Sequence, residues 1–288
     1  MIVVRLCGGL GNQLFQYAAG RRLAHARRAG LVLDLGWYAH TPSSDTPRTY
    51  ELEHYPIQAR PTTPGEALWC SLHHGRLLRH LPWLPRRWRQ YREKNFGFDP
   101  LALDLPDGTY LDGYWQSHRY FEDITDLIRT ELTPVVPFGP QDEELAAMIA
   151  EGDAVSMHVR RGDYVSHHVA AGNHGVCSVD YYKAAVVRVL QQVPRPHFFV
   201  FSDDPVWTRQ NLPLPGPTTF VEHNGSANAF QDLRLMSLCD HQITANSSFS
   251  WWGAWLNRRP DKMVVTPRQW FADQRDTGAL IPFNWIRL

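Results

Sequence analysis

The sequence of 288 residues lacks net charge, long hydrophobic runs and paired cysteines. Twenty-nine basic residues balance 29 acidic ones, which argues against general nucleic-acid binding. No apolar run approaches the roughly 18–20 residues that a membrane-spanning helix needs. The four cysteines show no C-x-x-C spacing, so neither a zinc site nor a redox pair is indicated, and we expect reduced thiols in a cytoplasmic protein. Lysine is scarce: 26 basic residues are Arg, a bias that a GC-rich genome suffices to explain.

The pattern of the chain changes near residues 134–142, where P-V-V-P-F-G-P-Q-D carries three prolines and a glycine. We predict a linker there. Upstream, the apolar pattern predicts a strand at 2–7, a helix near 12–29 and a short strand at 31–35. A stretch with little periodicity, from Gly36 to about Pro64, is expected to be a long loop.

Downstream of the linker, apolar strand-like runs alternate with helical patterns, which implies βαβ units and a parallel sheet. We therefore predict two facing α/β domains with a cleft between them, residues 1–140 and residues 141–288. Ligands of open parallel sheets bind beyond the carboxyl ends of the strands, so the polar clusters that follow these runs would converge on one site. The expected strands are 154–159, 197–201, 218–221, 241–245 and 262–266, and the expected helices are 179–193, 205–211, 227–238 and 248–257.

The first cluster is H-V-R-R-G-D-Y-V, residues 158–165. Arg160 and Arg161 at a strand end supply a fork of donors for a diphosphate, and Asp163 offers a carboxylate to hold that fork. Because side chains alternate along a strand, His158 and Arg160 share one direction. The alternative is an ordinary surface ion pair.

The second cluster is A-N-S-S-F-S-W-W-G-A-W-L-N, residues 245–257. Asn246, Ser247 and Ser248 can cap the following helix, whose first N–H groups would point at an anion. The three tryptophans of this segment fall mostly on one helical face, which favours core packing over a sugar-binding platform. They are Trp251, Trp252 and Trp255.

Two further clusters stand at predicted turns. Asp203 and Asp204 in F-S-D-D-P could hold a divalent metal, accept hydrogen bonds from a purine edge, or cap the next helix. The segment C-G-G-L-G-N-Q, residues 7–13, is a glycine turn into a helix that lacks the G-x-G-x-x-G spacing of a dinucleotide fingerprint. It leaves Asn12 and Gln13 as polar side chains at a helix start.

With these clusters in order along the chain, the sequence resembles the α-1,2-fucosyltransferases of glycosyltransferase family 11. It is more distantly similar to the α-1,6- and protein O-fucosyltransferases that share an H-x-R-R-x-D motif. The resemblance runs from G-G-L-G-N-Q through R-R-G-D-Y-V and H-G-V-C-S to N-S-S-F-S-W-W-G-A-W. It implies a GT-B fold of two Rossmann-like domains, GDP-β-L-fucose as donor, inversion at the anomeric carbon and no metal or other cofactor. The acceptor would be a terminal β-galactoside of lactose, an oligosaccharide or a lipid-linked glycan.

Carried onto this sequence, the resemblance implies that Arg160 contacts the β-phosphate of the donor. His158 and Asp204 would hold guanine or ribose, and Asn12 would lie near the transferred sugar. The remaining donor-binding candidates are Arg161, Asn246, Ser247, Ser248 and Phe249, and the acceptor-side candidates are Gln13 and Tyr164.

The group that deprotonates the acceptor hydroxyl stays open at this point. Asp163 is close to Arg160 in the sequence, although the same carboxylate could be used to orient that Arg. His174 lies between two glycines and has an ordinary pKa of about 6.5. In a third path, the leaving diphosphate accepts the proton and no side chain acts as the base.

One basic stretch lies outside these motifs, because residues 76–94 hold seven basic residues against one Glu, interleaved with Leu and Trp. It could make peripheral contact with the anionic inner face of a membrane, at about 1 kcal/mol per basic residue. Alternatively, it is a helix packed on its domain with a solvated basic face, which is favoured because Pro82 and Pro85 interrupt the amphipathic pattern.

Two other classes of protein compete with a transferase. A non-catalytic carbohydrate-binding protein would have no reason to keep Arg160, Asp163, Asp204 and the Ser247–Ser248 turn together. A nucleic-acid-binding protein is suggested only by the basic stretch. The enzymatic alternative is a fucosyltransferase of another linkage or acceptor.

Overall fold

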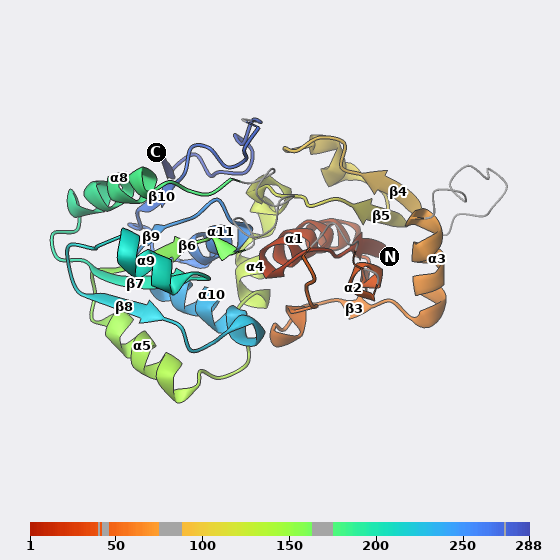
Figure 1. The fold of residues 1–288 in the computed structure, drawn as a ribbon. Coiled ribbons are helices and arrows are strands. Elements are labelled where there is room, and N and C mark those ends of the chain that lie inside the picture. The colour runs from red at the N-terminus through yellow and green to blue at the C-terminus, as the bar shows by residue number, and fades with distance from the viewer. Residues whose placement is uncertain (40, 42–45, 75–87, 163–174, 274) are drawn as a thin grey trace. The chain divides into compact units, whose positions relative to one another are not determined.

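The structure is a computed structural model that describes residues 1–39, 41, 46–74, 88–162, 175–273 and 275–288. The chain divides into two compact units. The first consists of Met1–Thr133 with Asp276–Ile281, and the second of Pro134–Arg275 with Pro282–Leu288. Each unit is built on its own sheet, and each is described separately (Figure 1).

The first unit contains a five-stranded parallel sheet in the order β3-β2-β1-β5-β4. The central strands read I-V-V-R and L-V-L-D and are almost wholly buried, as expected for strands covered on both faces. The strands are β1 (Ile2–Arg5), β2 (Leu31–Asp34), β3 (Arg60–Pro61), β4 (Arg89–Arg92) and β5 (Thr109–Asp112). The α-helices are α1 (Leu10–Arg27), α2 (Gly36–Ala39), α3 (Pro64–His74) and α4 (Thr125–Glu131).

A buried polar cluster fixes α1 to α4 in this unit. The Tyr17 hydroxyl donates to a carboxylate oxygen of Glu131 at 2.5 Å, and the Arg21 guanidinium donates to both oxygens of the same carboxylate. Burial and the adjacent Glu131 charge raise the pKa of Tyr17 far above its ordinary value, so its proton stays in this bond. The helix that follows the glycine turn is therefore firmly seated.

The second unit contains a six-stranded parallel sheet in the order β11-β10-β9-β6-β7-β8. Helix α8 packs on one face of this sheet, and α5 and α10 pack on the other. The strands are β6 (Ala154–Val159), β7 (His197–Ser202), β8 (Thr218–Val221), β9 (His241–Ile243), β10 (Val264–Thr266) and β11 (Ile286–Arg287). The described α-helices are α5 (Pro140–Ala150), α8 (Val179–Leu190), α9 (Pro205–Asn211), α10 (Ala229–Leu238) and α11 (Ser248–Leu256).

The predicted α/β class is confirmed, because both sheets are parallel and both units have the strand–helix alternation of a Rossmann-like domain. Strands 154–159 and 218–221 and helix 205–211 have the predicted bounds. The prediction that the tryptophans of residues 248–256 pack in the core is also confirmed. All three are buried, and Trp251 contacts Trp252 with ring centroids 5.1 Å apart.

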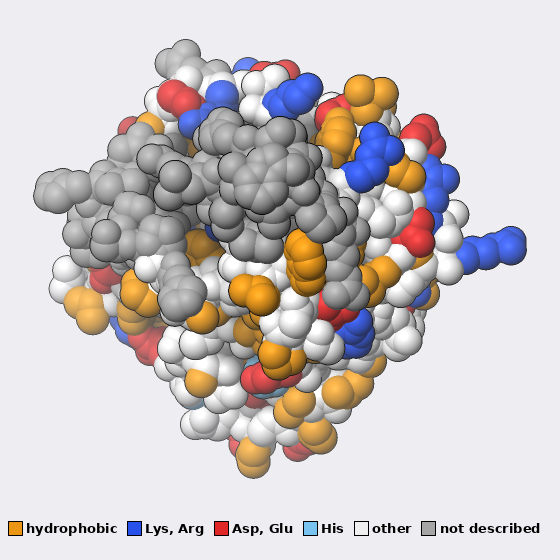
Figure 2. Space-filling view, turned by 90° about the vertical axis from the view of Figure 1, so that its right-hand side faces the viewer, with side chains coloured by type: hydrophobic (Ala, Val, Ile, Leu, Met, Phe, Trp, Pro, Cys, Tyr) orange, Lys and Arg blue, Asp and Glu red, His pale blue; other side chains and the backbone are white. Residues whose placement is uncertain are grey.

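The basic stretch needs a correction, because its described end is not helical. Arg89–Arg92 forms β4, an edge strand paired with β5, and Trp88 before it is buried. Residues 75–87 lie outside the described residues, so contact with a membrane stays a prediction. Over the described residues, no helix is long and apolar enough to cross a membrane. Figure 2 shows one face on which basic, acidic and hydrophobic side chains are interspersed.

Candidate functional site

Each sheet has one point where the strand order reverses, and ligands of open parallel sheets bind at the carboxyl edge beside that point. In the second unit the reversal lies between β6 and β9, and in the first unit between β1 and β5. The R-R-G turn follows β6, and N-S-S follows β9. The glycine turn follows β1, and G-Y-W-Q-S follows β5.

Two arginines after β6 are held by two carboxylates after β7. The strands pair with Val159 opposite Ser202, which brings Arg160 next to Asp203. Arg160 Nη1 lies 3.0 Å from Asp203 Oδ2, and the Arg161 N–H donates to Asp203 Oδ1 at 2.8 Å. Register thus fixes both the side chain of the first Arg and the backbone of the second.

Arg161 is held by a second set of contacts. Its Nε lies 3.5 Å from Asp204 Oδ2, and its guanidinium lies 3.6 Å from the ring centre of Trp207. Asp204 also caps α9, accepting from the Trp207 N–H at 3.1 Å, as one of the sequence alternatives predicted. Both carboxylate oxygens of Asp204 are therefore engaged.

Gly162 is required by the close approach of Asp203. A Cβ atom at Gly162 would lie 2.8 Å from Asp203 Oδ2. The sequence suggested that Asp163 would hold the arginines, but Asp163, Tyr164 and His174 lie outside the described residues. In the structure, Asp203 and Asp204 hold Arg160 and Arg161 instead, and the S-D-D sequence after β7 was the feature of the sequence that could have indicated them.

His158 lies in β6 one residue before its end and is only 6 % exposed. Its ring centre lies 5.6 Å from that of Phe249 in the first turn of α11. Burial, with a smaller contribution from Arg160, lowers the pKa of His158 to about 4, against the opposing effect of Asp203. The imidazole is therefore neutral at pH 7, and its Nδ1 has no hydrogen-bond partner among the described residues.

The amino end of α11 is capped by Ser247. The Ser247 hydroxyl accepts from the Phe249 N–H at 3.3 Å, and Ser248 is the first helical residue. The prediction that this serine segment caps the helix is confirmed for Ser247. The helix amino end adds its partial positive charge to the edge that carries Arg160.

Asn246 does not cap α11, because its side chain bonds to other loops. Its side chain is buried, and its amide donates to the carbonyl oxygens of Gly175 at 3.3 Å and Trp270 at 3.1 Å. Its Oδ1 accepts from the Cys177 thiol at 3.3 Å. These contacts give Asn246 a positioning role for two loops, and its contact with a donor stays a prediction.

In the first unit, Asn12 is held by a residue that the sequence interpretation missed. Gln116, four residues after β5, donates from Nε2 to Asn12 Oδ1 at 2.7 Å. Gly8 has a φ of 79°, and a Cβ atom there would lie 2.6 Å from Asn12 Nδ2. The glycine turn therefore lets Asn12 fold back on its own loop.

Gln13 is fully buried rather than facing a ligand. Its Nε2 donates to the carbonyl oxygens of Gly8 at 3.1 Å and Thr49 at 2.8 Å, and its Oε1 accepts from the Glu51 N–H at 2.9 Å. These bonds fix the segment around residues 49–51 against the glycine turn, and the proposed contact of Gln13 with an acceptor stays a prediction.

Two carboxyl groups near this edge have raised pKa values. Burial raises the pKa of Glu51 to about 7 and that of Glu93 to about 6. Glu93 accepts from the N–H groups of Tyr114 at 2.7 Å and Trp115 at 3.2 Å, so it holds the turn after β5. Neither Glu carries a recognisable motif, and the short T-Y-L-D strand before Tyr114 gave little periodic signal.

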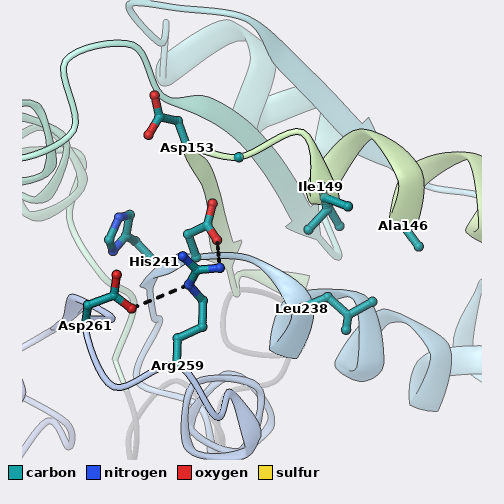
Figure 3. A pocket seen from close by; sticks show the side chains of 10 residues that line it. Ala146, Ile149, Asp153, Leu238, His241, Arg259 and Asp261 are labelled. Carbon is teal, nitrogen blue, oxygen red and sulfur yellow. Dashed lines mark ion pairs between the residues drawn. The ribbon is translucent and has the colours of Figure 1, made fainter.

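A separate pocket lies at the opposite edge of the second sheet, where β6 and β9 begin (Figure 3). Arg259 pairs there with Asp240 at 2.8 Å and approaches Asp261 at 3.6 Å. The pocket is thus separated from Arg160 by the length of β6. Among the described residues, no group of three or more His, Cys, Asp and Glu is placed to hold a metal ion.

Comparisons with known proteins identify the family of the chain. The model of Glycosyl transferase family 11 matches residues 80–288. The chain is 33 % identical to the O-antigen biosynthesis glycosyltransferase WbnK of Escherichia coli, over 98 % of this chain and 99 % of that protein. It is 30 % identical to an alpha-1,2-colitosyltransferase of Escherichia coli, over 100 % of this chain and 99 % of that protein.

A solved structure supports the fold. The chain is similar to a mutant of Arabidopsis thaliana FUT1 in complex with GDP, with a TM-score of 0.50 and 12 % identity. The match covers 91 % of this chain and 69 % of that one. The predicted GT-B-like α/β class is thereby supported for the fold alone.

Proposed function

Since the chain belongs to glycosyl transferase family 11, we propose that it transfers L-fucose from GDP-β-L-fucose to the 2-hydroxyl of a terminal β-galactoside. Transfer would invert the anomeric carbon and need no metal ion. That the chain is a glycosyltransferase of the α-1,2-fucosyltransferase-like kind follows from the family and its relatives. The donor, the acceptor and the course of the reaction are the proposal.

The observation that carries the proposal is the pair Arg160 and Arg161 at the end of β6, beside the capped amino end of α11. When the bond from the anomeric carbon to the diphosphate breaks, negative charge grows on the β-phosphate. Fixed cations and helix N–H groups at that position stabilise the transition state more than the ground state. Asp203 keeps Arg160 in place before the donor arrives.

We assign the donor to residues 141–288 and the acceptor to residues 1–140. In this assignment the neutral His158 lies beside Phe249 and faces the nucleoside. Asp204 acts through Arg161, because both of its oxygens are already engaged. Asn12 and Gln116 present their amides at the edge of the first sheet, where hydroxyl groups of a sugar would be bound.

Colitose is the second donor sugar to test, because one relative is named an alpha-1,2-colitosyltransferase. Colitose is L-fucose without its 3-hydroxyl. A site that hydrogen-bonds this hydroxyl would reject the deoxy sugar by about 10⁴–10⁵, whereas an apolar contact would discriminate only about 10–200-fold. The ratio of kcat/KM for the two donors therefore reports which kind of contact the chain makes.

The acceptor is proposed to be a galactoside of a surface glycan under assembly, since the first relative is named for O-antigen biosynthesis. Such an acceptor would place the enzyme in the cytoplasm, with peripheral contact at the inner face of the membrane as a further option. Flotation with anionic vesicles tests that contact, and equal recovery with neutral vesicles would dispose of it.

The direct test is transfer itself. The purified chain is treated with EDTA and incubated with GDP-fucose, GDP-colitose or GDP-mannose and a panel of β-galactosides and α-galactosides, and the products are analysed for linkage. We expect an α-1,2-linked product from a β-galactoside without added metal. A product of another linkage would correct the assignment, and activity only after Mn²⁺ is returned would refute metal independence.

A further inference from the structure

We infer that Glu93 is a positioning residue for the acceptor sugar, because its carboxylate fixes the turn that carries Gln116. The inference rests on the proposed function, in which Asn12 and Gln116 bind the acceptor at the carboxyl edge of the first sheet. All of the contacts that support it lie within the first unit.

The Glu93 carboxylate binds the backbone of two consecutive residues. Glu93 directly follows β4, and its own N–H donates at 2.9 Å to the carbonyl of Asp112, the last residue of β5. Its Oε2 accepts from the Tyr114 N–H at 2.7 Å, and its Oε1 accepts from the Trp115 N–H at 3.2 Å. Each carboxylate oxygen is therefore used by the turn that follows β5.

The close approach of the carboxylate explains the glycine at the start of this turn. A Cβ atom at Gly113 would lie 2.5 Å from the Glu93 Cβ and 2.9 Å from its Oε2. A larger residue would therefore displace either Glu93 or the turn. The sequence of the turn is thus matched to the position of this one carboxylate.

Trp115 has a backbone conformation that a bulky residue rarely adopts. Its φ is 56°, in the left-handed region where a Cβ atom crowds the carbonyl oxygen. Such a conformation persists only where the surrounding structure imposes it, and it is frequent at ligand-binding sites. Here it is imposed by the hydrogen bond to Glu93 and by the buried Trp115 ring, which stacks on Tyr91 with ring centres 6.3 Å apart.

The strained residue directly precedes the one that holds Asn12. Gln116 donates from Nε2 to Asn12 Oδ1 at 2.7 Å. On its other side, Ser117 is fully buried, and its hydroxyl donates to the Ala279 carbonyl at 2.6 Å. Gln116 therefore lies between two fixed residues, and the direction of its side chain depends on the backbone of Trp115.

Loss of the Glu93 contacts would let Trp115 relax to a negative φ. That rotation would turn the peptide leading into Gln116 and move its amide away from Asn12. An amide pair that contacts the sugar equally in the ground state and the transition state changes KM without changing kcat. Glu93 should therefore affect the KM for the acceptor and leave the chemical step unchanged.

The first test is a double-mutant cycle of Glu93→Gln and Gln116→Ala. Gln at residue 93 keeps the size of the side chain but replaces one acceptor oxygen by an NH₂ group that faces a backbone N–H. We expect the KM for the galactoside to rise about two- to tenfold in each single variant, with kcat and the KM for GDP-fucose close to wild type. Because Glu93 acts through Gln116, the double variant should show no larger rise than one single variant.

The control is Glu53→Gln, a change to an exposed Glu of the same unit, which should leave both KM values unchanged. Rises that multiply in the double variant, an unchanged galactoside KM in Glu93→Gln, or an equal rise for both substrates would overturn the inference. Wild-type transfer to the galactoside checks the proposed function in the same assay, so the two failures are distinguishable.

The pH dependence of KM keeps the inference testable if Gln at residue 93 destabilises the fold. Burial raises the pKa of Glu93 to about 6, against the two N–H bonds from the turn and with a smaller contribution from the charge of Asp112. The titratable and charged groups that face Glu93 are Asp112, which pairs with Arg5 and Arg92, and the phenol of Tyr120.

Protonation leaves Glu93 with one good acceptor oxygen, as in Glu93→Gln. The galactoside KM of the wild type should therefore rise as the pH falls below about 6, while the KM for GDP-fucose stays level. In Gln116→Ala the same rise should be missing, because the contact through which Glu93 acts has been removed. A rise that persists in Gln116→Ala, or a wild-type galactoside KM that is the same on both sides of this pKa, would contradict the assignment.

Discussion

The carboxyl edges of the two parallel sheets both contain a point where the strand order reverses, but they carry different side chains there. At the second sheet, the strand-order reversal carries two arginines, their two carboxylates and the capped end of α11. At the first sheet, it carries amides, tyrosines and carboxyl groups with raised pKa values. The first of these edges, with its arginines, is suited to stabilising negative charge, and the second, with its amides and phenols, to hydrogen-bonding neutral hydroxyl groups.

At both edges, a polar side chain that follows one strand is held by a side chain that follows the neighbouring strand. Arg160 follows β6 and is held by Asp203, which follows the neighbouring strand β7. Asn12 follows the turn after β1 and is held by Gln116, which follows the neighbouring strand β5. In both pairs of adjacent parallel strands, the register brings a residue that follows one strand within reach of a residue that follows the other.

The largest effect in the second unit is expected for Arg160→Ala. Removing one preorganised donor from a site of developing charge costs about 10²–10³ in kcat. The measurement is initial velocity at saturating GDP-fucose and galactoside, with GDP affinity measured in parallel. The change leaves the fold intact, because Arg160 lies at the edge of the sheet and outside the hydrophobic clusters.

The matched control is Arg209→Ala in α9 of the same unit. Arg209 forms an exposed ion pair at 2.8 Å with Glu222, which follows β8, two strands from β6. Exposed pairs contribute little to stability, so both activity and folding should match the wild type. If kcat of the Arg160 variant stays within tenfold of wild type, Arg160 does not stabilise the leaving diphosphate, and the proposed contrast between the two edges is wrong.

A smaller loss, of about tenfold in kcat, is expected for Asp203→Asn. Asn can still accept from the Arg161 N–H, but it loses the charge that holds the Arg160 guanidinium at 3.0 Å. Hydrogen bonds to charged groups contribute about 1.5–3 kcal/mol, part of which the diphosphate itself would restore in the complex. The control is Asp180→Asn on the exposed first turn of α8. A gain in kcat would show that Asp203 competes with the donor for Arg160.

The sequence could predict the strand before Arg160, but it could not predict which residue holds Arg160. Residues 154–159 form a mostly apolar run, and the polar residues directly after it could be placed at a strand end. The partner of Arg160 could not, because Asp203 is 43 residues away and Asp163 is adjacent in the motif. Register between strands decides such contacts, and a single sequence carries no direct record of register.

The first unit was harder to predict for a related reason. Strands β3 and β4 have two and four residues, and β5 has four, so none has enough length for a periodic signal. Gln116 donates to Asn12, and the backbone N–H of Glu51 donates to Gln13, from segments far along the chain. The glycine turn itself was recognised, because glycines before a helix leave a local signature.

An effect on one substrate alone is expected for Gln116→Ala. Asn12 then loses the 2.7 Å hydrogen bond that orients its amide, and a neutral hydrogen bond contributes about 0.5–1.5 kcal/mol. We expect the KM for the galactoside to rise about two- to tenfold, while the KM for GDP-fucose stays unchanged. The control is Gln90→Ala on β4, whose side chain donates to Asp112 at 3.2 Å. An equal rise in both KM values would contradict the separation of acceptor and donor between the units.

The smallest effect concerns the second use of Asp204, which both pairs with Arg161 and caps α9. Replacing an N-cap Asp by Ala costs about 1 kcal/mol of unfolding free energy, whereas Asn is as good an N-cap as Asp. Urea unfolding should therefore show Asp204→Ala destabilised by about 1 kcal/mol and Asp204→Asn close to wild type. Both variants remove the charge beside Arg161, so their losses of activity should be equal. Equal stability of the two variants would show that the Asp204 carboxylate acts only through Arg161. Wild-type activity in the Asn variant alone would show that Asp204 affects catalysis through the helix cap.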